Sequence, residues 1–143
     1  MSFLKTTAKL LRLSETILKW HGSLTDLQLK QREKLAKYAD EIAGCLARCV
    51  TACRQLADTG DNRAAALEVV RELGRMKGYV EDVTEALQDH LDGRKIAGVK
   101  RRLESLTVPP AKADGREFAD PANIERLLEA EGYIRSLADR LRI

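Results

Sequence analysis

Three cysteines form the most chemically distinctive pattern in this sequence. Cys45, Cys49 and Cys53 recur every four residues, so on a helix they lie within an arc of about 80°. Thiolates on one helical face can bind copper(I) or zinc, but a zinc site needs a fourth ligand. His21 and His90 are both expected at the far end of the helical hairpin described below, about 20 Å away. We therefore predict small buried core residues, with a metal site and a redox or intersubunit disulfide as the alternatives.

Catalytic motifs are missing from the chain. The sequence has no Gly-x-Ser-x-Gly, no phosphate-binding Walker loop, no glycine-rich dinucleotide fingerprint and no His-Glu-x-x-His. We accordingly predict no catalytic, cofactor-binding or metal-ligating residue and no enzymatic activity.

Two basic segments are candidates for contact with anions. The N-terminal helix sets its positive charges opposite an apolar face, which is typical of a helix on a membrane surface and equally of a covering helix in a bundle. The segment 94–103 has no acidic residue and could hold phosphate groups, although it lacks aromatic residues on which bases stack. For both segments an ordinary solvated face is the alternative. The anion- or lipid-contact candidates are Lys5, Lys9, Arg12, Arg94, Lys95, Arg101 and Arg102.

The elements that position these residues are predicted to be helices throughout, because apolar residues recur in steps of three and four and nowhere alternate. We predict an all-α, elongated antiparallel bundle of four main helices plus one short helix, forming a single domain over residues 1–143. A linker is expected at 107–120, where two prolines are adjacent. The expected helices cover 3–20, about 23–58, 62–91, a short stretch after Gly93, and the chain from Pro121 onward.

The second and third of these helices are expected to form an antiparallel hairpin that turns at Gly60. Lys30, Arg32, Lys34 and Lys37 would then lie opposite the acidic residues of 81–92, which is the charge pattern of paired helices. Gly44, Gly74 and Gly78 are expected to meet at the middle of the hairpin and allow a close approach, with a hinge as the alternative.

Length arithmetic draws attention to the tip of this hairpin. The first helix, about 27 Å long, can cover only the 24–41 half of the second helix, which leaves the end near Gly60 without cover. We predict that this tip either receives the C-terminal helix or pairs with a partner or a second subunit. The protein-interface candidates are Cys45, Cys49, Leu56, Leu67, Val70 and Leu73, with core packing as the alternative.

Composition limits the function classes without choosing among them. The 143 residues are 44% hydrophobic and 33% charged, with a net charge of +3 that by itself indicates neither a nucleic-acid nor a membrane partner. Residues 1–60 carry +4, residues 61–106 carry 0 and residues 107–143 carry −1. No apolar run approaches the ~18 residues needed to cross a bilayer, and three clustered cysteines make no disulfide framework, so we expect a cytoplasmic protein.

The function hypothesis from sequence is a non-catalytic helical bundle that acts through protein–protein interaction or self-association. A membrane-associated bundle that uses its N-terminal helix is the first alternative, and a nucleic-acid-binding protein that uses residues 94–102 is the second. No small-molecule substrate and no cofactor is indicated.

Overall fold

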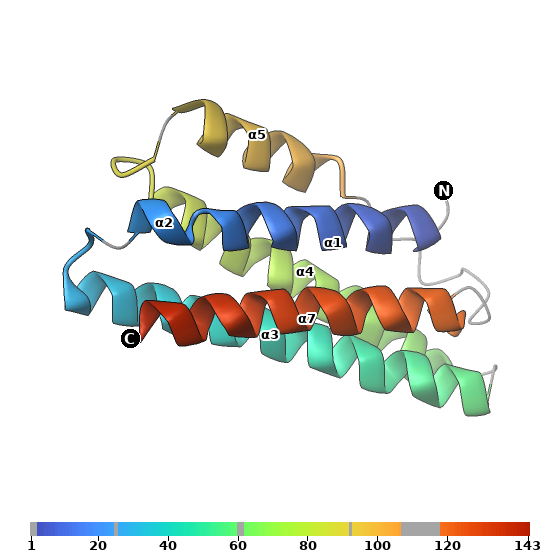
Figure 1. Cartoon of the computed structure of the whole chain (residues 1–143). Coiled ribbons are helices and arrows are strands. Elements are labelled where there is room, and N and C mark those ends of the chain that lie inside the picture. The colour runs from blue at the N-terminus through green and yellow to red at the C-terminus, as the bar shows by residue number, and fades with distance from the viewer. Residues whose placement is uncertain (1–2, 25, 60–61, 92, 107–117) are drawn as a thin grey trace.

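The computed structural model describes residues 3–24, 26–59, 62–91, 93–106 and 118–143. Within these ranges every regular element is a helix and there is no strand, so the all-α prediction is confirmed (Figure 1). The helices are α1 (Phe3–Lys19), α2 (His21–Leu24), α3 (Leu29–Asp58), α4 (Arg63–Ala86), α5 (Gly93–Glu104) and α7 (Pro121–Leu141).

Two predicted helix starts are confirmed by their capping hydrogen bonds. The Asn62 side chain accepts from the backbone N–H of Ala65 at 3.0 Å and opens α4. Asp120 Oδ1 accepts from the N–H of Ala122 at 2.9 Å, with Pro121 in the first turn of α7. Each cap satisfies a donor that the helix itself leaves without a partner.

The boundaries around α2 and after α4 differ from the prediction. Residues 21–24 form α2, and α3 begins only at Leu29 because the buried side chains of Leu24 and Leu27 anchor the intervening connection in the core. Helix α4 ends at Ala86 rather than at residue 91. There the Leu87 carbonyl accepts from the N–H groups of His90 and Leu91, which closes a turn before α5.

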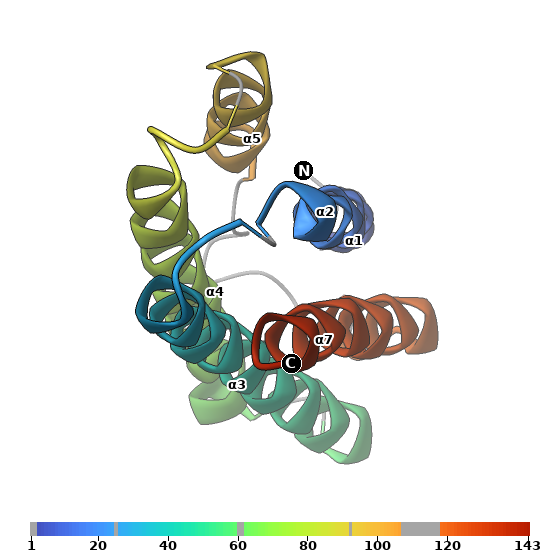
Figure 2. The same ribbon diagram turned by 60° about the vertical axis from the view of Figure 1, so that its left-hand side comes forward.

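Five of the helices surround one core, and each lies beside two others. Helix α7 packs between α1 and α3, α4 packs on the other side of α3, and α5 lies against both α1 and α4 (Figures 1 and 2). The bundle is elongated, as predicted, because these helices run nearly along one axis (Figure 1).

Polar contacts fix the directions of the helices. Thr7 donates a 2.9 Å hydrogen bond to Asn123, and Tyr133 donates to Glu15 at 3.3 Å, so α1 and α7 run in the same direction. At the other end, Arg142 pairs with Asp40, so α7 runs antiparallel to α3. The pair α1–α7 is therefore the parallel exception in a bundle whose other neighbours are antiparallel.

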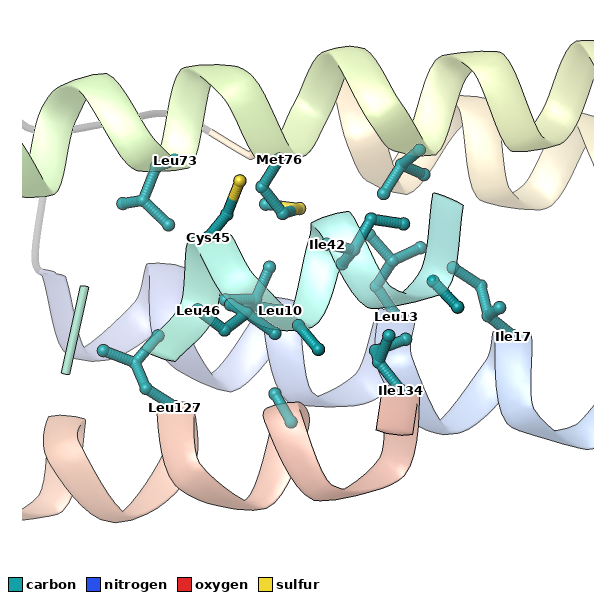
Figure 3. Close-up of a cluster of buried hydrophobic side chains, with 14 of the residues drawn as sticks. Leu10, Leu13, Ile17, Ile42, Cys45, Leu46, Leu73, Met76, Leu127 and Ile134 are labelled. Carbon is teal, nitrogen blue, oxygen red and sulfur yellow. The ribbon is translucent and has the colours of Figure 1, made fainter. Parts of the chain in front are cut away.

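The position of α1 differs from the one expected from helix lengths. We expected α1 to lie directly on the 24–41 half of α3, whereas its packing partner along its length is α7. Apolar side chains of α1 meet α3 only across the core, where Leu10 and Leu13 lie close to Leu46 and Ile42 (Figure 3). The cause is α7, which covers the face of α3 that the length arithmetic assigned to α1.

The predicted linker contributes to the core at its end. Phe118 is fully buried and its ring meets that of Phe3 edge to face, with the centroids 4.6 Å apart. This contact joins the start of α7 to the start of α1 and adds to the area that both rings bury. Residues 107–117 of the predicted linker lie outside the described ranges.

The predicted meeting of three glycines is wrong. Gly74 and Gly78 are exposed, and a Cβ added at either would meet nothing within 4 Å. They lie on the outer face of α4, because the side chains turned toward α3 come from Leu73 and Met76 (Figure 3). At Gly44 the space is taken by the guanidinium of Arg48, 3.3 Å from the position of a Cβ.

Candidate functional site

The hairpin tip, where the interface candidates lie, is covered by the chain itself. Helix α7 packs along α3, and Leu127 lies close to Leu46 in the core (Figure 3). Of the two outcomes expected for the tip, packing of the C-terminal helix against it is therefore the one observed. Among the six candidates, Cys45, Cys49, Leu56 and Leu73 are at most 2% exposed, Val70 is half-buried and Leu67 is 43% exposed.

The three cysteines are free and buried. Burial raises the pKa of Cys53 to about 12 and the pKa of Cys49 well above its ordinary value. The pKa of Cys45 is raised as well, first by burial and then by its contact with Glu72. Since the thiolate is the nucleophile and the metal ligand, these shifts favour the unreactive thiol. In the described part of the chain, no three His, Cys, Asp or Glu side chains are grouped so that they could hold a metal ion.

A buried carboxylate lies beside Cys45, and the sequence pattern did not single it out. Glu72 is 1% exposed and accepts from Arg48 Nε and Arg75 Nη1, both at 3.0 Å. Burial by itself raises the pKa of Glu72, but the hydrogen bonds from Arg48 and Cys45 and the two positive charges outweigh it and leave the pKa below its ordinary value. Arg48 and Glu72 thus tie α3 to α4 at mid-length.

This ion pair revises the charge pattern expected for the hairpin. The antiparallel arrangement of α3 and α4 is confirmed, but among the described residues the ion pair that links them is Arg48–Glu72. No described residue of 30–37 pairs within 4.0 Å with one of 81–91. A signal for the pair was present in the sequence: Glu72 adjoins the apolar seam of Val69, Leu73 and Met76.

The basic candidates of α1 share one side of that helix. Lys5, Lys9, Arg12 and Lys19 lie within an arc of about 80°. Three are exposed, and the fourth, Lys9, is half-buried because its Nζ donates to the Ser105 carbonyl at 3.3 Å. The apolar side of α1 is the opposite one: Phe3, Leu10, Leu13 and Ile17 are at most 2% exposed.

The basic candidates of α5 lie directly beside those of α1. The two helices run antiparallel, because Lys9 reaches Ser105 and the Arg102 guanidinium reaches the Thr16 hydroxyl. Helix α5 buries Ile96, Val99 and Leu103 and exposes Arg94, Lys95, Lys100, Arg101 and Arg102. Two segments about 90 residues apart in the sequence therefore form one surface, with α5 beside α1 in both views (Figures 1 and 2).

We call this the α1/α5 basic surface. Helices α1 and α5 hold nine basic and two acidic residues, a balance of +7, whereas the whole chain carries only +3. Within the described ranges, the ion pairs join residues of α3, α4, α7 and Arg142, and Lys5, Arg12, Lys19 and Arg101 take part in none of them. The charges of these four side chains are therefore left for solvent or a partner.

Two grooves concentrate neither sign of charge, and the first of them adjoins the α1/α5 basic surface at Lys100. The groove between α4 and α5 has a volume of about 270 Å³ and the groove between α3 and α4 about 370 Å³. The first mixes two lysines with three glutamates, and the second places Arg48 and Glu68 among neutral residues. Near Trp20 the core encloses an apolar void of about 10 Å³, which offers no polar partner for a ligand.

Comparison with known proteins gives no further guide to function. No protein family, curated protein or solved structure that was compared matches this chain. None of the helices in the described ranges is long and apolar enough to cross a membrane. The geometry of the α1/α5 basic surface is therefore the basis for a functional assignment.

Proposed function

We propose that this protein is a non-catalytic binding protein, and that the α1/α5 basic surface is where it holds a polyanionic macromolecule. The observation that carries the proposal is the placement of α5 beside α1, which joins two basic segments whose helices together carry a balance of +7. A surface with one sign of charge raises the local concentration of an oppositely charged partner and speeds its association.

Burial of Ile96, Val99 and Leu103 holds α5 in the bundle, whereas the charges of α1 and α5 oppose this placement. Like charges on neighbouring helices repel, and this repulsion works against the pairing of α1 and α5. Two polar contacts between α5 and α1 end on neutral oxygens, the Ser105 carbonyl and the Thr16 hydroxyl, so they leave the charges of Lys9 and Arg102 uncompensated. A polyanion would supply that compensation.

The other interpretations have less support from the geometry. A protein interface at the hairpin tip would rest on Leu67 and Val70, because the other four candidates are inside the core, and single exposed apolar residues are common on protein surfaces. A membrane-bound α1 would have to withdraw Phe3, Leu10 and Ile17 from that core. Raised thiol pKa values argue against cysteine catalysis, and free buried thiols suit the reducing cytoplasm that forms part of this proposal.

Chromatography on immobilised heparin tests the proposal. The double variant Arg12→Glu/Arg101→Glu reverses one charge on each helix of the surface. Its matched control, Arg54→Glu/Arg63→Glu, makes the same change in net charge at exposed positions of α3 and α4. We expect the wild type and the control to elute at similar salt concentrations and the surface variant to elute much earlier. Equal elution of the two variants would refute the proposal.

A further inference from the structure

The partner class of the α1/α5 basic surface follows from what surrounds its charges. A membrane-bound helix inserts apolar side chains among the lipids, but the apolar side of α1 faces the core and Trp20, at its end, is 3% exposed. In the described part of α1 and α5, Leu4 is the one large hydrophobic residue that is more than one-third exposed, at 37%. The surface therefore has little to place in a bilayer.

Single-stranded nucleic acid is also a poor fit. Proteins that bind single strands stack the bases on exposed aromatic rings between basic residues. Phe3 and Trp20 are buried, and the partly exposed tyrosines, Tyr38, Tyr79 and Tyr133, belong to α3, α4 and α7. The surface thus offers charge without a stacking platform.

An acidic protein partner would require a different kind of patch. Protein interfaces usually have an apolar or aromatic centre within a polar rim. The exposed side of α1 and α5 has charge at its centre, where Arg12 and Arg102 flank the line along which the helices meet, and its exposed leucine lies at one end. This arrangement lacks the desolvated anchor that gives such interfaces their affinity.

A duplex backbone matches both the charge and the length of the surface. From Lys5 to Lys19 the basic side of α1 extends about 21 Å, over which a duplex presents about 12 phosphates. Arg12, Arg101 and Arg102 can each offer a planar fork of N–H donors, which suits phosphate oxygens. Extended rows of exposed cations without base-reading side chains correspond to recognition of the backbone.

We infer that the α1/α5 basic surface binds the phosphate backbone of double-stranded nucleic acid, without preference for sequence. This inference rests on the proposed function, and it names the partner of the same surface. DNA and RNA duplexes share the phosphate chemistry, and the experiment separates them.

Fluorescence anisotropy with the full chain tests the inference. The probes are a labelled 20-base-pair DNA duplex, the RNA duplex of the same sequence, one labelled DNA strand, and vesicles of 70% phosphatidylcholine and 30% phosphatidylserine in a parallel sedimentation assay. We expect at least one duplex to bind at 50 mM salt at least tenfold more tightly than the single strand, and the vesicles to leave the protein in the supernatant. A scrambled duplex should bind within about threefold of the first.

The two charge-reversal variants locate the binding surface. We expect Arg12→Glu/Arg101→Glu to weaken duplex binding at least tenfold and to lower the slope of log K against log salt by about 2, one for each phosphate that the variant no longer neutralises. The control Arg54→Glu/Arg63→Glu should stay within about threefold of the wild type. Circular dichroism of each variant checks that the helical fold persists.

Failure of this inference can be told apart from failure of the proposed function. If heparin binding depends on Arg12 and Arg101 but the single strand or the vesicles bind as well as both duplexes, the surface binds polyanions and the duplex assignment is wrong. If the two variants behave alike on heparin and on every probe, the α1/α5 basic surface is not the binding site and the proposed function is wrong.

Discussion

Replacement of Glu72 by glutamine would test the central electrostatic contact of the fold. Its carboxylate is 1% exposed and accepts from two guanidinium groups at 3.0 Å, one on α3 and one on α4. Glutamine keeps the shape of the side chain but removes its charge. The change therefore measures what the ion pairs contribute beyond packing.

The magnitude follows from the burial of the partners. A hydrogen bond to a charged group contributes about 1.5–3 kcal/mol when the pair is shielded from water. Here Arg48 and Arg75 remain 45% and 44% exposed, so water takes over much of their solvation once the carboxylate is removed. We expect Glu72→Gln to lower the free energy of unfolding at pH 7 by about 1–2 kcal/mol.

The contribution of Glu72 to the free energy of unfolding changes with pH in a definite direction. The pKa of Glu72 in the folded protein lies below the ordinary value of 4.5 that applies after unfolding. The unfolded chain therefore takes up a proton first as the pH falls, and the stabilisation is present above about pH 4.5 and lost as the pH falls through the folded pKa. The difference in stability between the wild type and Glu72→Gln should shrink between pH 5 and pH 3.

Urea unfolding of three proteins checks this reasoning. The matched control is Glu68→Gln, one turn earlier on α4, because Glu68 pairs with an Arg71 side chain that is 67% exposed. That control should lose less than about 0.5 kcal/mol. Equal losses in the two variants at pH 7, or a loss for Glu72→Gln that stays constant down to pH 3, would refute the account of a buried and charged Glu72.

Three further predictions concern the core. Leu127→Ala should lower the free energy of unfolding in urea by about 2–5 kcal/mol. The control Leu128→Ala, at a position 41% exposed, should lower it by less than about 0.5 kcal/mol. Similar losses in the two variants would contradict the covering of the tip by α7. Asn123→Ala should cost about 1–2 kcal/mol, because it removes the buried hydrogen bond from Thr7, and an unchanged stability would count against that contact. At pH 8 the three buried thiols should react with a thiol reagent over about 100-fold more slowly in the native protein than in urea; rapid labelling of any of them without unfolding would contradict their placement.

Local chemistry explains which parts of the fold could be predicted from the sequence. The caps at Asn62 and Asp120 act on their own helices, so the residue types alone indicate them. The α3–α4 hairpin follows from two apolar seams joined by a short turn. The position of α7 could not be derived in the same way, because the apolar sides of α1 and α7 are both compatible with α3. Which of these two helices packs on α3 depends on contacts between distant residues, such as Thr7 with Asn123 and Phe3 with Phe118.

The failed glycine prediction has a related cause. Level positions on paired helices do not fix which way a residue faces, and a step of one residue, about 100° around the helix, separates the buried Leu73 from the exposed Gly74. The burial of Glu72 was not predicted for the same reason, because it depends on Arg48 from the facing helix.

The net charges of the sequence segments did not indicate where positive charge gathers in the folded protein. Residues 61–106 carry no net charge, because Asp61, α4 and the turn after α4 together carry −4, which cancels the +4 of α5 when all are summed over one sequence window. In the structure one of the two neighbours of α5 is α1, whose balance is +3, so on that side α5 faces a second basic helix. An electrostatic field adds over distance in space, and separation in sequence does not enter it. A net charge of +3 is therefore compatible with two neighbouring helices that together carry +7 and a remainder that carries −4, and this asymmetry is the basis of the polyanion binding that we propose for the α1/α5 basic surface.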